Sequence, residues 1–565
     1  MGSQVPIKIF RYLVRCGVLV LGLHLAGCAT ATKNIKKEPA TLSEKQWVET
    51  TLKGLSLREK VGQMFFASVT GIYYPKNTPA WQQMERQVRD LGVGGFHIWR
   101  GEPYAVVALI NHLQSLAKVP LLFEADFEHG TGWRFAGGTD FPPAMAIAAT
   151  GDTSYAYEMG RITGMEARAM GLHMTFAPVV DVNSNPYNPI INTRSFGETT
   201  EQVSKFATAF IRGAHAAEML TTAKHFPGHG DTGMDSHLVL ATIDADSSRL
   251  FAVELKPFEA AIRSGVDAIM TAHIYLKHWP MQPYRPATLS PEILTGLLRN
   301  RLGFKGLIFT DAMGMFAIHH NFTEKYAAVA AVKAGADVIL VSPRLRSSID
   351  AVVQAVERGE ISEARIDQSV RRILQAKARA GLHANKRVSA AKLPEKLGMP
   401  QSVKIAETAA QKAITLLRNR EGLVPIRPAF QDSAIALVMV ADQPIPNLGQ
   451  QLVGRLQPAL PRLTVDVLSS ETAEESIAPV LKHVENASLV IMPVFAFVQA
   501  YRNGTQLSPH VARAVQEILS REVPVILVSM GSPYILQNFQ QADAYLCAYG
   551  PTDLMQTALA NALLG

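Results

Sequence analysis

Between residues 50 and 385, short apolar runs alternate with segments whose small and apolar residues recur at helical spacing. Segments 154–170 and 201–217 show this spacing most clearly. Strands that alternate with helices form parallel sheets, because each crossover places a helix on a sheet face. The pattern therefore predicts a (β/α)8 barrel. The eight expected strands are Met64–Val69, Gly94–Trp99, Pro120–Ala125, His173–Val179, Met219–Ala223, Ala268–Ala272, Leu307–Thr310 and Val338–Val341.

A second alternation of strands and helices follows the expected barrel, which spans residues 46–385. Residues 386–402 are polar, contain two prolines and are expected to form a linker. Residues 403–565 then predict a smaller three-layer αβα domain, so the fold class is α/β with two domains. Its expected strands are residues 434–440, 465–468, 489–494, 523–528 and 544–548.

Charged side chains directly follow four of the expected barrel strands. Because active sites of (β/α)8 barrels lie at the C-terminal ends of the strands, these positions predict the active-site face. The residues are Asp126, Lys224, His225, His273 and Asp311.

The segment from Lys224 to His237 reads KHFPGHGDTGMDSH and holds three histidines, a lysine and two aspartates. Pro227 and three glycines within it predict that a strand passes into a long loop. Loops of this kind often carry catalytic groups, because a rigid scaffold positions them.

KHFPGHG followed by DSH, together with FTDAMGM at residues 309–315, resembles the signatures of glycoside hydrolase family 3 in its β-N-acetylhexosaminidase branch. The resemblance implies a retaining β-N-acetylglucosaminidase in which Asp311 is the nucleophile, His237 protonates the leaving group and Asp235 orients the imidazole. Histidine suits this role because its ordinary pKa of ~6.5 allows it to give and take a proton near neutrality.

The same resemblance implies a set of residues that hold the terminal sugar. His129 replaces the first glycine of the family's usual D-x-E-G-G sequence, so the local turn is expected to differ. A second set is expected to support the site from behind. The expected sugar-binding residues are Asp126, Arg134, Arg194, Lys224 and His225, and the expected supporting residues are His229, Asp181 and His273.

Three other functions stay open from the residues alone. A metal hydrolase would use nitrogen and oxygen ligands that zinc accepts, although the spacing lacks an HExxH pattern. A β-glucosidase or xylosidase of the same family would place an acid/base carboxylate in the second domain. A non-catalytic wall-binding protein is disfavoured by the intact catalytic residues. For the glycosidase we expect no cofactor and no metal. If the protein were instead a metal hydrolase, the ligands would be His225, His229, Asp231, Asp235 and His237.

The N-terminus combines basic residues, an apolar stretch over residues 16–26 and the sequence LAGC, which resembles a bacterial lipobox. We expect residues 1–28 to be a lipoprotein signal peptide, with cleavage before Cys28 and acylation of that cysteine. Residues 29–45 would then tether the enzyme to a bacterial membrane after export. Of the three cysteines, only Cys547 would remain, so no disulfide is expected.

The formal charge of +7 is spread along 565 residues without a basic block, which argues against a nucleic-acid partner.

We expect a monomer that acts on oligosaccharides with a terminal β-N-acetylglucosamine, such as peptidoglycan fragments or chitin-like chains. A catalytic histidine would repel phosphate less than a carboxylate, so phosphorolysis beside hydrolysis is a hypothesis. The chain stops at Gly565, where relatives of this family generally continue, which leaves open an incomplete second domain.

Overall fold

The computed structural model describes residues 43–441, 443, 445, 447–498 and 506–565, all within one compact unit. The expected signal peptide, the expected lipidation site Cys28 and nearly all of the expected tether lie outside the described residues. In the described part of the chain, no helix has the length and apolar character needed to cross a bilayer.

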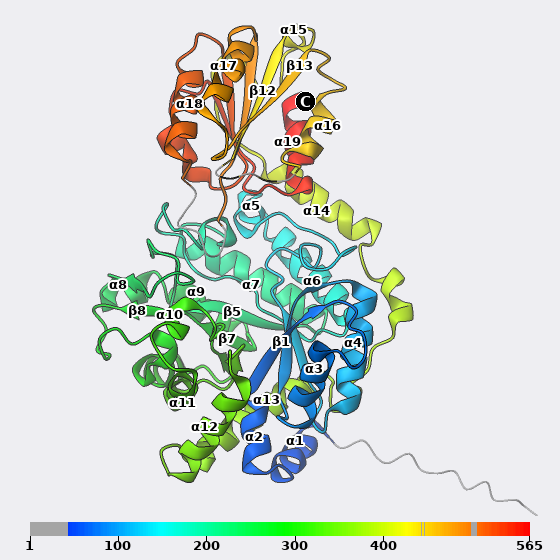
Figure 1. Ribbon diagram of the computed structural model, residues 1–565, viewed down its shortest axis with the longest axis vertical. Helices are drawn as coiled ribbons and strands as arrows, with labels where there is room; N and C mark the ends of the chain where they lie inside the picture. The colour runs from blue at the N-terminus through cyan, green and yellow to red at the C-terminus, as the bar shows by residue number, and fades with distance from the viewer. Residues whose placement is uncertain (1–42, 442, 444, 446, 499–505) are drawn as a thin grey trace, which may run out of the picture. The chain divides into compact units, whose positions relative to one another are not determined.

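The first domain is the eight-stranded parallel barrel that the sequence predicts. Its strand order is β10-β1-β2-β3-β4-β5-β7-β9, and a parallel bridge between Phe309 and Val338 closes it. Strand β4 is shorter than the expected 173–179. The strands, blue to green in Figure 1, are β1 (Phe65–Gly71), β2 (Gly95–Gly101), β3 (Leu122–Ala125), β4 (Met174–Thr175), β5 (Leu220–Phe226), β7 (Ala268–Thr271), β9 (Leu307–Phe309) and β10 (Ile339–Leu340).

Helices connect successive strands on the outside of the barrel, as parallel pairing requires. Two more helices, α1 (Glu44–Lys53) and α2 (Leu57–Gln63), precede the first strand. The connecting helices are α3 (Pro79–Arg89), α4 (Pro103–Leu116), α6 (Thr153–Met170), α7 (Thr200–Ala216), α9 (Lys256–Arg263), the π-helix η3 (Glu292–Arg301) and α11 (Glu324–Ala334). After the last barrel strand, β10, come α12 (Leu345–Glu357) and α13 (Glu363–Arg379).

Helices α6 and α7 show how the sequence sets the packing. The Asp152 side chain accepts the Ser154 N–H at 2.9 Å and starts α6, which ends at Gly171 with a φ of 89°. A Cβ added at Gly160 or Gly213 would collide with the backbone of the other helix. The small residues that give these segments their helical spacing therefore allow the two helices to pack closely.

The second domain contains a six-stranded sheet in the order β11-β16-β15-β14-β12-β13. The five expected strands are present, and a sixth that was not expected, β11 (Thr415–Asn419), pairs antiparallel with β16. The helix α14 (Pro400–Ala413) begins within the expected linker. The remaining strands are β12 (Ile435–Ala441), β13 (Leu463–Leu468), β14 (Leu489–Phe495), β15 (Val525–Ser529) and β16 (Ala544–Cys547).

Helices cover both faces of this second sheet and make the three layers that the sequence predicts. Figure 1 shows α16 (Gln450–Leu456) and α19 (Asp553–Leu564) on one face, and α17 (Ile477–Glu485) and α18 (Pro509–Leu519) on the other. The strands between them are almost entirely apolar, as expected for a sheet buried on both faces.

Aromatic rings fill the barrel interior below the ends of the strands. The ring centroids of Phe66 and Phe309 lie 5.5 Å apart, and those of Phe176 and Phe309 lie 5.3 Å apart. All three side chains are buried. These rings form an apolar floor beneath the charged residues at the C-terminal ends of the strands.

Candidate active site

A cavity of about 650 Å³ lies at the C-terminal ends of the barrel strands. It brings together most of the residues that the sequence singled out, from β5 and from the segments that follow β3, β4, β5 and β9. The other three, Asp235, Asp181 and His273, bond to residues of the cavity wall. The predicted residues that line the cavity are Asp126, Arg134, Arg194, Lys224, His225, His229, His237 and Asp311.

Asp311 follows β9, and its carboxylate is fixed by the neighbouring backbone. The Ala312 N–H donates to Asp311 Oδ1 at 2.7 Å. Burial raises the pKa of Asp311, but nearby imidazoles, His273 foremost, and the Ala312 amide more than offset this and lower the pKa overall. Asp311 is therefore ionised near neutrality, as a nucleophile must be.

His273 fixes the turn that carries Asp311. Its Nε2 lies 3.1 Å from the carbonyl oxygen of Ala312, and its Nδ1 lies 2.8 Å from Thr288 Oγ1. Because a carbonyl oxygen only accepts, Nε2 carries the proton in this contact. Burial lowers the pKa of His273, although the nearby Asp311 carboxylate opposes this, and the two ring contacts make His273 a support for the turn.

His237 and Asp235 form a close imidazole–carboxylate pair on the loop after β5. The Asp235 Oδ1 atom lies 2.7 Å from His237 Nδ1 and accepts the His237 backbone N–H at 2.8 Å. Asp235 is buried, whereas the His237 side chain reaches the cavity. A carboxylate on Nδ1 assigns the proton to that nitrogen, so Nε2 is the atom that can exchange a proton in the cavity.

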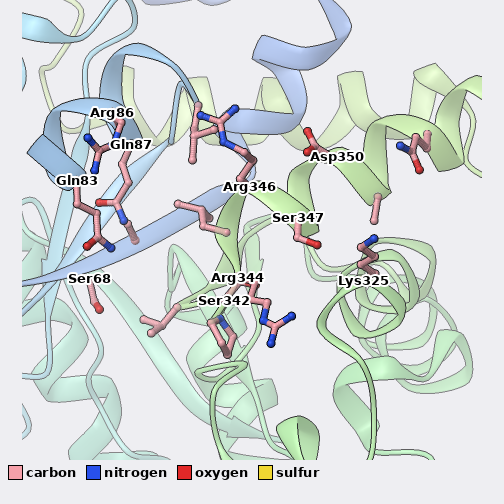
Figure 2. Close-up of a pocket in the computed structure, with 17 residues that line it drawn as sticks. Ser68, Gln83, Arg86, Gln87, Lys325, Ser342, Arg344, Arg346, Ser347 and Asp350 are labelled. Carbon is pink, nitrogen blue, oxygen red and sulfur yellow. The ribbon is translucent and has the colours of Figure 1, made fainter.

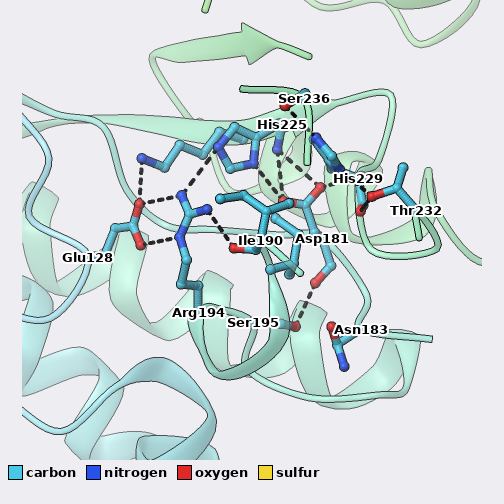
Figure 3. A network of polar contacts seen from close by, with 12 residues as sticks. Glu128, Asp181, Asn183, Ile190, Arg194, Ser195, His225, His229, Thr232 and Ser236 are labelled. Carbon is cyan, nitrogen blue, oxygen red and sulfur yellow. Dashed lines mark hydrogen bonds and ion pairs between the residues drawn. The ribbon is translucent and has the colours of Figure 1, made fainter. Parts of the chain in front are cut away.

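Asp181 anchors the start of the same loop (Figure 3). Its buried carboxylate accepts the backbone N–H groups of His225 at 3.2 Å and His229 at 2.7 Å, and lies 2.7 Å from His225 Nδ1. These contacts make Asp181 a support for the loop after β5. Burial raises the pKa of Asp181, but its hydrogen bonds and the two histidines lower it overall.

His229 holds the loop from within. Its Nδ1 lies 2.7 Å from Thr232 Oγ1 and its Nε2 lies 2.9 Å from Ser236 Oγ. Burial and the nearby His225 lower its pKa to about 4, so the ring is neutral. The short bond to Ser236 ties His229 to the residue between Asp235 and His237, which fixes the end of the loop.

A corner of the cavity contains two carboxylates and two cations, all buried or partly buried. Lys224 Nζ lies 2.8 Å from Asp126 Oδ1 and 2.7 Å from Glu128 Oε1. Arg194 donates two hydrogen bonds to Glu128, both at 2.8 Å (Figure 3). Paired, charge-assisted bonds of this kind fix geometry as well as energy.

These contacts keep the corner fully charged. Burial raises the pKa of both carboxyls, but Lys224 lowers the pKa of Asp126 to about 2, and Arg194 with Lys224 holds that of Glu128 well below its usual range. Burial lowers the pKa of Lys224, but the two carboxylates raise it overall. Glu128 stands in the D-F-E-H-G sequence but was not among the expected site residues.

The substitution at His129 is accommodated because Gly130 carries the left-handed conformation, with a φ of 94°. His129 Nδ1 lies 3.1 Å from Asp140 Oδ1. A Cβ at Gly130 would collide with the carbonyl oxygen of Thr139. The turn therefore requires glycine at position 130 and tolerates a side chain at position 129.

The second domain also lines the cavity, through residues 497–498 and 549–552. Its Tyr534 hydroxyl accepts a hydrogen bond from Asn183 Nδ2 at 2.9 Å, and Ser532 Oγ accepts one from Asn192 Nδ2 at 3.2 Å. Asn183 and Asn192 belong to the segment that carries Asp181 and Arg194. No motif in the sequence of the second domain indicated this contribution.

The metal alternative finds no support in this geometry. Within residues 43–441 and the described part of the second domain, no group of three His, Cys, Asp or Glu side chains is arranged to hold a metal ion. Both ring nitrogens of His229 contact hydroxyl groups, and Asp231 lies 3.1 Å from Arg249. His229 and Asp231 are therefore directed at protein partners and not at a shared metal position.

A second cavity, of about 750 Å³, lies between α3 and α12 (Figure 2). Its charged side chains are exposed and several are paired at the surface: Arg344 with Glu324 at 3.4 Å, and Asp350 with Arg58 at 2.7 Å. Exposed pairs of this kind contribute little energy. Only the cavity at the strand ends combines buried charge with the predicted residues.

Comparisons with known proteins show which family the chain belongs to. A model of the glycosyl hydrolase family 3 N-terminal domain matches residues 56–376. A β-N-acetylglucosaminidase/β-glucosidase from Cellulomonas fimi is 30% identical over 92% of this chain and 93% of its own length.

Solved structures give the same result for both domains. A family 3 β-N-acetylglucosaminidase from Paenibacillus sp. str. FPU-7 is 34% identical, with a TM-score of 0.80 over 90% of this chain and 97% of its own. A β-glucoside phosphorylase is 25% identical, with a TM-score of 0.81 over 93% of this chain and 96% of its own. The chain belongs to glycosyl hydrolase family 3.

Proposed function

We propose that the protein is a retaining exo-β-N-acetylglucosaminidase that releases terminal β-linked N-acetylglucosamine. The observation that carries the proposal is the presence of an ionised carboxylate, Asp311, and a carboxylate-bound histidine, His237, in one cavity. The names of the relatives from Cellulomonas fimi and Paenibacillus support the choice of sugar. The family supports the choice of reaction.

In the first step, an Asp311 carboxylate oxygen attacks the anomeric carbon and forms a glycosyl ester. The bond from that carbon to the leaving oxygen breaks, and the leaving oxygen takes the proton from His237 Nε2. In the second step, water attacks the same carbon, gives its proton back to His237 and releases Asp311 as a carboxylate. Two displacements at one carbon retain the configuration.

Asp235 has a defined role in both steps. Because its Oδ1 lies 2.7 Å from His237 Nδ1, it fixes the ring and stabilises the imidazolium that donates the proton. The paired charges of Asp126, Glu128, Lys224 and Arg194 supply directed donors and acceptors for sugar hydroxyls. A corner crowded with such groups at one side of the cavity favours a terminal sugar over the middle of a chain.

The test is hydrolysis of chromogenic β-glycosides by the protein from residue 29 onward. We expect cleavage of the N-acetylglucosaminide, and a loss of at least about 10⁴-fold in Asp311→Asn, because the variant lacks the nucleophile. Asp350→Asn, in the second cavity, is the matched control and should keep full activity. Cleavage of glucosides or xylosides alone would overturn the choice of sugar, and an active Asp311→Asn would overturn the mechanism.

Phosphorolysis is a second candidate, because an imidazole in place of a carboxylate leaves less negative charge facing the acceptor. The similarity to a β-glucoside phosphorylase also favours it. Incubation with phosphate should then yield the sugar 1-phosphate. Free sugar alone, at a rate that phosphate does not change, would exclude this activity.

For the natural setting we propose export and acylation at Cys28, with wall-derived fragments as substrates. The support is the lipobox-like LAGC sequence behind a basic and apolar N-terminus. Expression of the full chain should give a membrane-bound, acylated form, detected by fractionation and mass spectrometry. Cys28→Ser should abolish acylation, and a wild-type protein without lipid would contradict the proposal.

A further inference from the structure

Two polar side chains inside the barrel have no part in the mechanism above. His97 lies on β2 and Glu124 on β3, at paired positions of adjacent strands. The His97 Nδ1 and Glu124 Oε2 atoms lie 2.6 Å apart, with 2% and 0% of the two side chains exposed. A carboxylate and an imidazole buried in an apolar barrel are costly to fold, so their presence requires an explanation.

His97 helps to line the cavity, and its other ring nitrogen, Nε2, is buried in the cavity wall. Nε2 has no hydrogen-bond partner in the part of the chain that the structure describes, and it lies 3.7 Å from Asp126 Oδ2. Arg134 Nη2 lies 3.6 Å from the same oxygen. Both separations are too long for hydrogen bonds, so two donors surround one acceptor without reaching it.

The carboxylates on both sides of His97 determine its protonation. Burial lowers the pKa of His97, but Glu124 and, further away, Asp126 raise it overall. Burial also raises the pKa of Glu124, so a proton is held between that carboxyl and Nδ1. The Asp126 carboxylate beside Nε2 offers only lone pairs, which favours a proton on that nitrogen and makes it the donor. The ring is also fixed in orientation, because it stacks on Phe176 at 5.7 Å with an interplanar angle of 8°.

We propose that His97 is a substrate-binding residue, whose Nε2–H donates to the sugar hydroxyl that Asp126 accepts from, and that Glu124 is the positioning residue behind it. A hydroxyl oxygen about 2.8 Å from both atoms spans the 3.7 Å gap, and because Nε2 is buried, a neighbouring side chain has to move aside to admit it. A hydroxyl needs a donor and an acceptor, and this arrangement offers one of each. The identity of the sugar rests on the proposed function.

The test compares kcat/KM on the intact chromogenic glycoside and on its 3-, 4- and 6-deoxy forms. His97→Phe keeps the ring volume and the stack on Phe176 but removes the donor. We expect the wild type to discriminate against one deoxy form, and His97→Phe to lose about tenfold or more on the intact sugar, an effect of ~1.4 kcal/mol. On that deoxy form the variant should lose little, because the interaction is already absent.

Two further variants keep the proposal testable if His97→Phe folds poorly. Glu124→Gln keeps the shape but removes the charge that favours a proton on Nε2, so it should show the same substrate-specific loss to a smaller extent. His97→Gln retains an amide donor and should recover part of the lost discrimination. His112→Phe is the matched control, because His112 pairs with Glu85 at 3.1 Å outside the cavity.

An equal loss on every substrate would assign His97 a structural role and overturn the proposal, and so would the absence of any loss. A wild type that discriminates against none of the deoxy forms would also overturn it. If the wild type prefers glucosides, the proposed function fails separately. The same comparison on deoxyglucosides would then still test His97.

Discussion

Two buried lysines lie at opposite ends of the barrel and have opposite pKa shifts. Lys224, at the C-terminal ends of the strands, has 2% of its surface exposed and bonds to two carboxylates, and its pKa is raised. Lys377, on α13, is fully buried and donates to the Gln63 side chain at 2.6 Å, and burial lowers its pKa to about 7.

The difference shows how one barrel separates activity from stability. The C-terminal end retains buried charges because each is neutralised by a partner, and these charges are directed at a cavity. At the N-terminal end, Lys377 has no carboxylate partner among the described residues, and burial therefore makes it lose its proton more easily. We therefore expect changes at Lys224 to alter catalysis, and changes at Lys377 to alter stability alone.

The largest expected effect within this comparison is on activity at Lys224. Lys224→Met should lower kcat/KM by about 10² to 10³-fold, because the charge-assisted bonds to two carboxylates and the proposed bond to the sugar are lost. Lys377→Met is the matched control and should retain full activity. Steady-state kinetics on the chromogenic substrate distinguishes the two, and equal losses would contradict the division of roles.

A substitution at His237 tests whether the C-terminal end of the barrel donates a proton to the leaving group in addition to binding the sugar. His237→Gln should lose about 10²-fold on a substrate with a poor leaving group, because general acid catalysis typically contributes this much. It should lose much less on an activated aryl glycoside, whose leaving group needs no proton. A loss of similar size on both substrates would indicate that His237 positions the loop and does not donate the proton.

The next largest effect is expected on the free energy of unfolding when Lys377 is replaced. Below pH ~7 this lysine is charged in both states, so the folded protein carries the cost of burying it. Between pH ~7 and ~10.4 the unfolded chain retains a proton that the folded protein has lost, so this contribution to stability rises with pH. Lys377→Met should raise the free energy of unfolding by about 1 to 4 kcal/mol at neutral pH and remove this rise.

Urea denaturation of the wild type and of Lys377→Met at pH 6 and pH 9 gives the free energy of unfolding of each at both pH values. A destabilised Lys377→Met, or a variant that keeps the same dependence on pH, would contradict the account of the N-terminal end. The Gln63 side chain loses one partner in the variant but keeps its bond to the Gly92 carbonyl oxygen at 2.8 Å.

The smallest effect is expected at the second cavity, between α3 and α12. A double change of Arg344 and Arg346 to Ala should leave kcat/KM within about twofold and unfolding free energy within ~0.5 kcal/mol, as for exposed residues in general. A large loss of activity would show that the chemistry is not confined to the cavity at the strand ends.

Most of the fold could be predicted because apolar runs define buried parallel strands. Strand β11 was not predicted because it is an edge strand with a half-exposed pattern, and its sequence TLLRN continues a helical one. The antiparallel pairing with β16 depends on a contact far along the chain, which local periodicity does not reveal.

The strand-end residues of the site could be predicted because the barrel brings those ends together. His97 and Glu124 could not, since each stands inside an apolar strand where a single polar residue gives no pattern. A signal was present in hindsight, because a glutamate within a buried strand requires a partner. The contribution of residues 549–552 follows from domain packing and has no local sequence signal.

The central claim is that Asp311 forms a covalent bond to the sugar. A fluorinated N-acetylglucosaminyl donor that forms the glycosyl ester quickly and hydrolyses it slowly would trap the intermediate. Mass spectrometry of the whole protein should then show one added sugar, and peptide mapping should assign it to the segment that contains Asp311. An adduct on another residue, or complete turnover without any adduct, would contradict the account.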